Sequence, residues 1–93
     1  MAVPFSERVM LAGHVLAQEI QGEVVLLNLT SQRYFALDEM GSSVWQELTA
    51  ASSIEVAYER LLSLYEVGPG QLREDLQAFV QQLVTNDLVE VSR

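Results

Sequence analysis

Side chains that could support catalysis are few in this sequence. The 93 residues include no cysteine and a single histidine, His14. The acidic pairs Asp38–Glu39 and Glu74–Asp75 are adjacent in sequence, and adjacent residues of a helix do not face each other. We therefore interpret both pairs as charges near helix N-termini, where acids are favourable to the dipole. Because no nucleophile–base pair, acid couple or metal-ligand set is evident, we expect a non-catalytic protein without metal or cofactor.

A small-residue segment offers one further chemical possibility. Gly41 and Ser42 lie in the sequence GSSVW, which could suggest a carrier protein with a modified serine. We favour a helix whose first turns contain these two residues and whose Trp45 belongs to the core. The other glycines form no phosphate-binding motif.

The charge of the chain argues against nucleic acids as partners. Thirteen acidic residues stand against five basic ones, which gives a net charge of −8. Affinity for nucleic acids comes largely from Lys and Arg at phosphates, and this sequence contains no lysine. No apolar run approaches the roughly 20 residues that span a bilayer, and the N-terminal MAVPFSERVM lacks the basic start of a signal peptide. We therefore expect a cytoplasmic protein that binds neither nucleic acid nor membrane.

The hydrophobic period changes within residues 33–45, and this change decides the order of the elements. Residues 33–37 alternate as in a strand, whereas Trp45 and Leu48 recur at helical spacing. Asp38, between the two patterns, is of a residue type that caps helices. We therefore predict strands before this point and helices after it.

Three strands are predicted in the first half of the chain. Their connections are short and polar, with Gln21 and Gly22 as a tight turn in which glycine supplies a positive φ. Such connections favour an antiparallel meander. The strands are expected at residues 14–20, 23–29 and 33–37, after an extended arm at residues 1–10.

Three helices are predicted in the second half, each with an apolar stripe. Ser52 and Glu55 have the spacing of a capping box at the start of the second helix. We therefore predict a single α+β domain over residues 1–93, in which a three-stranded antiparallel sheet is followed by three helices in a winged helix-turn-helix-like arrangement. The helices are expected at residues 39–50, from the capping box to about residue 65, and at 71–84, before a short extended tail.

The third strand could bind a peptide along its edge. Edge strands present unpaired N–H and C=O groups, and residues 33–37 contain no proline, lysine or glycine that would block pairing. A peptide could add there as a further strand, with the third helix as the opposite wall of a groove. Phe35, Leu76 and Phe79 could border this groove or belong to the core, whereas Tyr34 is expected to be exposed.

Five segments follow one another along the chain: EVVLLNL, RYFAL and DEMGSSVWQEL, then SIEVAYERLLSLYEV, and finally DLQAFVQQLVTNDLV. This ordered set resembles the PqqD family, whose members bind peptides in pyrroloquinoline quinone biosynthesis and in other pathways of ribosomally made peptide natural products (RiPPs). The resemblance implies a winged helix-turn-helix fold that is used for a peptide in place of DNA. In the family, a leader peptide adds to the third strand and lies against the third helix.

Carried over to this sequence, the resemblance implies a set of peptide-binding residues. Asp75 would meet a cation or a backbone amide of the leader, and Arg33 would meet an acid. The pairing edge is Arg33, Tyr34, Phe35 and Ala36, and the facing wall is Leu72, Asp75, Leu76, Phe79 and Val80.

Free-standing acidic chains of this kind look most like the discrete recognition protein of lasso-peptide pathways. The resemblance implies that such a protein delivers the precursor peptide to a separate leader peptidase and works beside a cyclase. Two alternatives remain at this point. One is a DNA-binding or regulatory winged helix, although residues 71–84 carry one arginine against two acids. The other is a structural subunit whose groove is a permanent interface.

Overall fold

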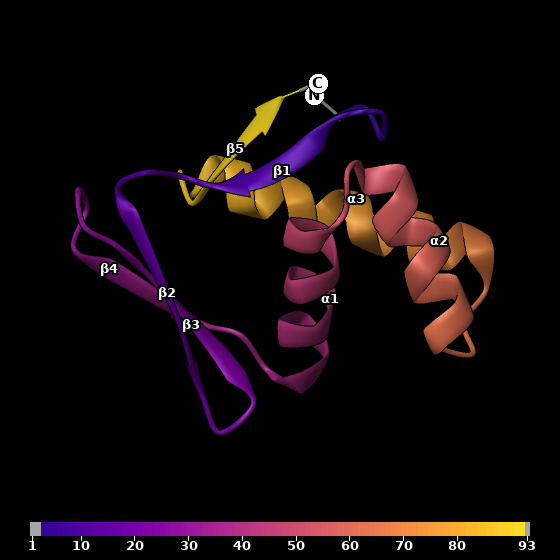
Figure 1. Ribbon diagram of the computed structural model, residues 1–93, viewed down its shortest axis with the longest axis horizontal. Coiled ribbons are helices and arrows are strands. Elements are labelled where there is room, and N and C mark those ends of the chain that lie inside the picture. Colours follow the sequence, from indigo (N-terminus) through magenta and orange to yellow (C-terminus); the bar gives the residue numbers. More distant parts are fainter. Residues whose placement is uncertain (1–2, 93) are drawn as a thin grey trace.

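The computed structural model describes residues 3–92 and confirms the predicted α+β architecture (Figure 1). A three-stranded antiparallel sheet has the strand order β2–β3–β4 and precedes all three helices. The turn between its first two strands has Gln21 and Gly22 at φ of 53° and 84°, which confirms the tight turn predicted there. The strands are β2 (Val15–Ile20), β3 (Glu23–Asn28) and β4 (Arg33–Ala36).

A second, two-stranded sheet joins the two ends of the described chain. Strand β1 (Arg8–Leu11) pairs antiparallel with β5 (Val89–Ser92), and Val9 lies opposite Val91. The sequence analysis did not predict this pairing. Residues 8–10 of the expected arm thus form a strand, residues 3–7 precede it, and residues 1–2 lie outside the described residues.

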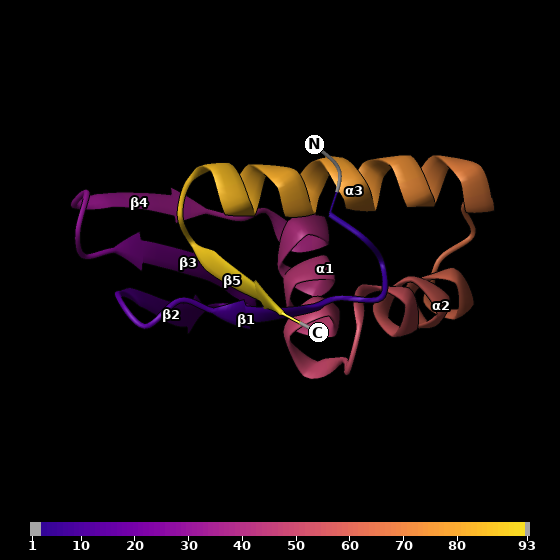
Figure 2. The ribbon, with the colours of Figure 1, turned by 90° about the horizontal axis from the view of Figure 1, so that it is seen from above.

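The three helices pack together beside the sheet (Figures 1 and 2). They are α1 (Glu39–Ala50), α2 (Ile54–Leu64) and α3 (Pro69–Thr85). Helix α1 begins as predicted, because the Asp38 carboxylate accepts a hydrogen bond of 2.7 Å from the Gly41 N–H. Helix α3 begins earlier than predicted, with Pro69 in its first turn, where proline is well tolerated.

The capping box predicted at Ser52 is wrong by one residue. Ser53 is the N-cap of α2, and its hydroxyl accepts a hydrogen bond from the Val56 N–H. The N–H groups of Ile54 and Glu55 donate instead to carbonyl oxygens of residues 7 and 5, each at 2.8 Å. The N-terminal segment therefore satisfies the start of α2, an interaction between distant parts of the chain that local spacing does not reveal.

The N-terminal segment also joins α2 and α3 through Arg73. The Arg73 guanidinium lies 4.5 Å from the centre of the Phe5 ring and 4.4 Å from that of Tyr58, and it donates a hydrogen bond of 3.0 Å to Glu55. This hydrogen bond raises the pKa of Arg73 above its ordinary value. The cluster fixes the segment before β1 to the helices.

A single hydrophobic core lies between the sheet, the ribbon β1–β5 and the helices. One face of β3 supplies Val24 and Leu26 to it, since alternate residues of a strand point to the same side. Trp45 is 5% exposed, as expected for a core residue, and Val9 of β1 and Val89 of β5 are also buried. The core therefore holds β4 and α3 in fixed positions at the surface.

Candidate functional site

The outer edge of β4 is open. The Leu37 N–H donates to the Val24 carbonyl of β3 at 2.9 Å. Because main-chain groups of an antiparallel strand point alternately to its two sides, Phe35 also faces β3, whereas the N–H and C=O groups of Tyr34 and Ala36 face outward. Within residues 3–92 no strand pairs with this edge. The row of main-chain groups that the sequence analysis identified is therefore unoccupied by the described parts of the N- and C-terminal segments.

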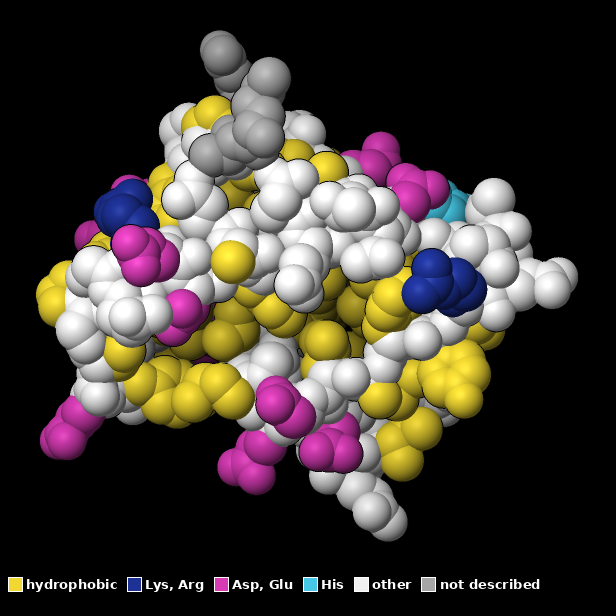
Figure 3. All heavy atoms as spheres, turned by 180° about the vertical axis from the view of Figure 1, so that it is seen from behind, with side chains coloured by type: hydrophobic (Ala, Val, Ile, Leu, Met, Phe, Trp, Pro, Cys, Tyr) yellow, Lys and Arg dark blue, Asp and Glu magenta, His cyan; other side chains and the backbone are white. Residues whose placement is uncertain are grey.

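Helix α3 lies on the same face of the molecule as β4 (Figures 1 and 2). The space-filling view of this face shows hydrophobic side chains gathered in a band with a hollow near its middle (Figure 3). Acidic side chains stand along one border of the band. The surface thus combines an apolar floor with an acidic margin.

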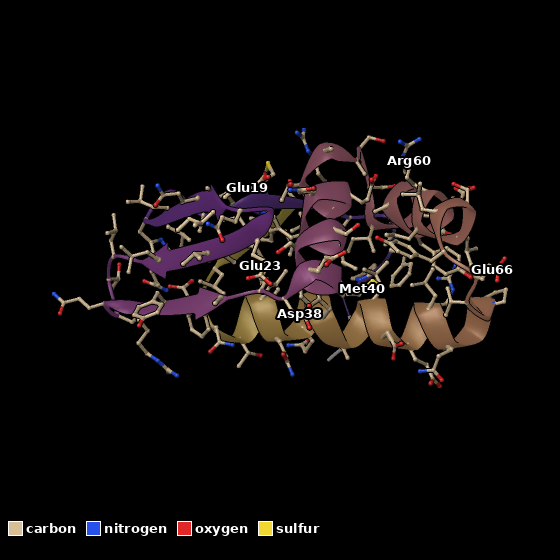
Figure 4. The ribbon with its side chains drawn as sticks, turned by 90° about the horizontal axis from the view of Figure 1, so that it is seen from below. Glu19, Glu23, Asp38, Met40, Arg60 and Glu66 are labelled. Atoms are coloured by element: carbon tan, nitrogen blue, oxygen red, sulfur yellow. The ribbon has the colours of Figure 1, made fainter. Side chains whose placement is uncertain are left out.

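An apolar cavity of about 260 Å³ opens between the three helices. Residues 40 and 41 place the start of α1 on its wall, and Figure 4 labels Met40 near the side of α1 that faces α3. A cavity of this size accepts a large side chain of a partner. Its lining is Met40, Gly41, Val44, Leu61, Tyr65, Val67, Leu72, Asp75, Leu76 and Phe79.

Few polar groups interrupt the cavity lining. The Asp75 carboxylate is exposed at the rim and accepts a hydrogen bond of 2.8 Å from the Gln71 side-chain amide. The Tyr65 hydroxyl lies 2.6 Å from the Ser43 hydroxyl, so both groups have a hydrogen-bond partner. The lining therefore suits an apolar or aromatic group, with one carboxylate available for a cation or an N–H donor at its entrance.

A second, polar hollow of about 240 Å³ lies at the opposite end of β4. The turn before β4 and the C-terminal end of α3 form its walls, and Arg33 is part of its lining. The Arg33 guanidinium lies 5.5 Å from the centre of the Phe35 ring. The site thus has an apolar end near the start of α1 and a polar end beside Arg33. The hollow is lined by Asn28, Thr30, Ser31, Arg33, Thr85, Asn86 and Asp87.

The structure brings most of the predicted wall residues to one cavity. Leu72, Asp75, Leu76 and Phe79 all line it. Val80 does not, because it is turned into the core and is only 1% exposed. On β4, the predicted edge residues Arg33, Tyr34 and Ala36 are exposed and Phe35 is half-buried against the core.

The sequence analysis did not assign the cavity residues of α1, α2 and the following loop to the site. The apolar stripes of the predicted helices do not distinguish a core position from a cavity wall. These stripes include Met40, Val44, Leu61 and Tyr65. Among these residues, only the type of Met40 indicated a binding surface, since flexible methionines often line adaptable binding surfaces. Met40 is 53% exposed although it belongs to one of these stripes.

Neither a cluster of metal-ligating side chains nor a membrane-spanning helix is found among the described residues. Over residues 3–92, no three His, Cys, Asp or Glu side chains cluster closely enough to hold an ion. In the same range no helix is long and apolar enough to cross a bilayer. The open edge of β4, the apolar cavity between the helices and the polar hollow beside Arg33 together form the candidate site.

Comparisons with known proteins agree with this architecture. The family model described as "Coenzyme PQQ synthesis protein D (PqqD)" matches residues 23–89. A solved structure described as "TbiB1 in Complex with the TbiA(beta) Leader Peptide" is 31% identical, has a TM-score of 0.81, and covers 87% of this chain and 94% of its own. A search of curated proteins found no match.

A second solved structure is similar in fold. It is described as "Lasso peptide synthetase B1 complexed with the leader peptide", with 24% identity, a TM-score of 0.80, and coverage of 89% of this chain and 98% of its own. Each alignment covers nearly all of the matched protein's chain, so the similarity extends over the whole fold.

Proposed function

The chain belongs to the PqqD family, and from this premise we propose that it binds the leader segment of a ribosomally made precursor peptide. The leader adds as a strand to the outer edge of β4 and lies against α3. One observation carries the proposal: an open strand edge lies on the same face as an apolar cavity of about 260 Å³. The similar protein TbiB1 was solved in complex with a leader peptide, which supports the same use of this fold.

The binding mode combines backbone pairing with side-chain selection. The outward N–H and C=O groups of Tyr34 and Ala36 pair with the leader backbone and are indifferent to its sequence. An apolar side chain of the leader fills the cavity beside Leu76 and Phe79 and supplies selectivity. This arrangement is consistent with a Kd between about 1 nM and about 1 µM, or roughly −12 to −8 kcal/mol.

The charged groups at the two ends of the site select flanking residues of the leader. Asp75, at the rim of the cavity, meets a leader cation or a backbone N–H. Arg33, in the polar hollow, meets a leader acid. Since both side chains are exposed, each contributes less than about 1 kcal/mol and sets the preferred register more than the affinity.

Delivery of the precursor follows from binding. A leader held on this chain keeps its attached core peptide near a partner enzyme and so raises its effective concentration there. We propose that the partner is a separate leader peptidase, with a cyclase acting afterwards, as in lasso-peptide biosynthesis. We place this assembly in the cytoplasm, where precursor peptides are synthesised, and assign the chain itself no catalytic step.

Titration with leader peptides tests the proposal. The probes are a fluorescein-labelled TbiA(beta) leader peptide and the N-terminal segment of any short peptide encoded next to the gene of this chain, each with a sequence-scrambled control. We expect saturable binding of at least one leader, and in ¹⁵N-labelled protein the largest amide shifts within residues 33–37. Binding of the scrambled peptide with equal affinity, or shifts confined to other strands, would contradict the proposal.

A further inference from the structure

Two buried polar side chains lie at the two ends of β4. Asn28 is 2% exposed and Ser42 is 1% exposed, and they are the buried polar residues of the described chain. Buried polar groups are costly unless their hydrogen bonds are satisfied. The partners of these two side chains therefore show which parts of the molecule they hold together.

Asn28 joins the turn before β4 to the end of α3. Its Oδ1 accepts hydrogen bonds from the N–H groups of Thr30 and Ser31, at 3.0 and 3.1 Å. Its Nδ2 donates to the carbonyl oxygens of Asn86 and Asp87, at 3.3 and 3.2 Å. All the usual hydrogen-bonding capacity of the amide is thus engaged within the chain, and none remains for a bound peptide.

The backbone on both sides of this contact is unusual. Gln32, in the turn before β4, has φ of 61°, and Asp87, after α3, has φ of 56°. Residues other than glycine seldom adopt this left-handed region, and they persist in it where the surroundings hold them. The Asn28 amide binds the turn that contains Gln32 and the carbonyl of Asp87 itself, so it holds both segments.

Ser42 joins separate segments by hydrogen bonds at the other end of β4. Its hydroxyl accepts a hydrogen bond of 2.8 Å from the Val24 N–H and lies 3.3 Å from the Leu37 carbonyl, to which it donates. Val24 belongs to β3, Leu37 follows β4, and Ser42 lies in the first turns of α1. One hydroxyl therefore fixes the exit of β4 against the helix whose start lines the apolar cavity.

We propose that Asn28 and Ser42 are positioning residues for the bound leader, an inference that rests on the proposed function. They fix β4 relative to α3 and α1 from both ends, so that an added strand meets the edge of β4 and the cavity at once. Strand pairing requires a spacing of about 4.8 Å between neighbouring strands. A groove whose walls are already held in place before binding loses less free energy on ordering, so it binds more tightly.

The variant Asn28→Asp tests the contact across the groove. It retains an oxygen for the Thr30 and Ser31 N–H groups but replaces the Nδ2 donor by an oxygen that faces two carbonyl groups. We expect the Kd for the leader peptide bound by the wild-type chain to rise at least tenfold, while the far-ultraviolet circular dichroism remains native. The amides of residues 34–36 and 86–87 should shift in the free variant, before any peptide is added.

Ser53→Ala is the matched control. It removes the hydroxyl that caps α2, so it lowers thermal stability without touching β4. All Kd values are measured at 10 °C, where each variant is confirmed to be folded. If Asn28 only stabilises the fold, Asn28→Asp and Ser53→Ala should bind the leader peptide with similar affinity. If Asn28 positions the groove, only Asn28→Asp should bind the leader peptide more weakly.

Ser42→Ala provides an independent test at the other end of the strand, and alanine is favourable within a helix. We expect a rise in Kd of at least fivefold, with shifted amides at residues 24 and 37. Wild-type affinity in folded Asn28→Asp would overturn the role of Asn28, and wild-type affinity in Ser42→Ala would overturn that of Ser42. If Asn28→Asp does not fold, Ser42→Ala decides the proposal. If the wild-type chain binds neither leader peptide, that result contradicts the proposed function itself.

Discussion

At the scale of single residues, Phe79 and Val80 show how one helical step separates a cavity-lining position from a core position. Phe79 lines the cavity and is half-buried, whereas Val80, its neighbour in sequence, is 1% exposed. Adjacent residues of a helix differ in direction by about 100°. The predicted wall of α3 therefore contains residues with different surroundings, although Phe79 and Val80 belong to one apolar stripe.

Phe79→Glu tests the cavity directly. A carboxylate placed among apolar side chains opposes entry of an apolar leader residue at a cost of roughly 3 kcal/mol, so we expect the leader Kd to rise about 100-fold. Fluorescence polarisation measures the change. Ala78→Glu places the same charge on the exposed neighbour and should leave the Kd within about threefold of wild type. Unchanged affinity in Phe79→Glu would refute the use of this cavity.

At the scale of elements, β4 owes its availability to its place in the sheet. It is the last strand of the order β2–β3–β4, and the chain turns from it directly into α1. The ribbon β1–β5 forms a separate sheet and leaves the edge of β4 free in the described structure. The strand has four residues, so a peptide added there, as proposed, would meet only a few main-chain groups and would depend on the cavity as well.

Tyr34→Pro tests the edge. Proline removes the outward N–H and places its ring where the partner strand would approach, although an edge strand tolerates it structurally. We expect the leader Kd to rise more than tenfold, measured by titration calorimetry, because at least one hydrogen bond is lost and the ring obstructs pairing. Tyr34→Ala retains the N–H and should bind far better than the proline variant. Equal affinity of the two would mean that the leader uses another surface.

The three strands of the meander and the three helices could be predicted from the sequence, because they depend on local patterns. The alternation in residues 33–37 and the Asp38 cap give the transition from β4 to α1 correctly. The start of α2 could not be placed by the same means. There the N–H groups of Ile54 and Glu55 bind carbonyl oxygens of the N-terminal segment, and no local rule describes a partner so distant in sequence.

At the scale of the whole molecule, the features that sequence patterns do not predict are those that depend on contacts between distant segments. The cavity requires residues of α1, α2 and α3 together, and β1 requires β5 as its partner. The family resemblance supplied the general placement of the groove between the third strand and the third helix, but not the contributions of α1 and α2. Those contributions follow from the packing of the three helices.

Phe5→Ala tests the attachment of the N-terminal segment. Phe5 is half-buried, packs edge-on against Tyr58 and lies beneath Arg73. We expect a loss of about 2 kcal/mol in the free energy of unfolding and a decrease of about 10 °C in Tm, as followed by circular dichroism. The exposed Ser6→Ala is the control and should change Tm by less than about 2 °C. Equal Tm values for the two variants would show that the Phe5 side chain contributes nothing to stability.

The ribbon β1–β5 has a consequence for engineering. Arg8 lies opposite Ser92, so the first strand of the chain begins beside the end of the last one. A unit with neighbouring ends can be spliced into a surface loop of a host enzyme without stretching the host. Neither ribbon strand lines the cavity. Such a transplanted cassette would keep its groove exposed and could give an unrelated catalyst a tag-directed choice of substrate.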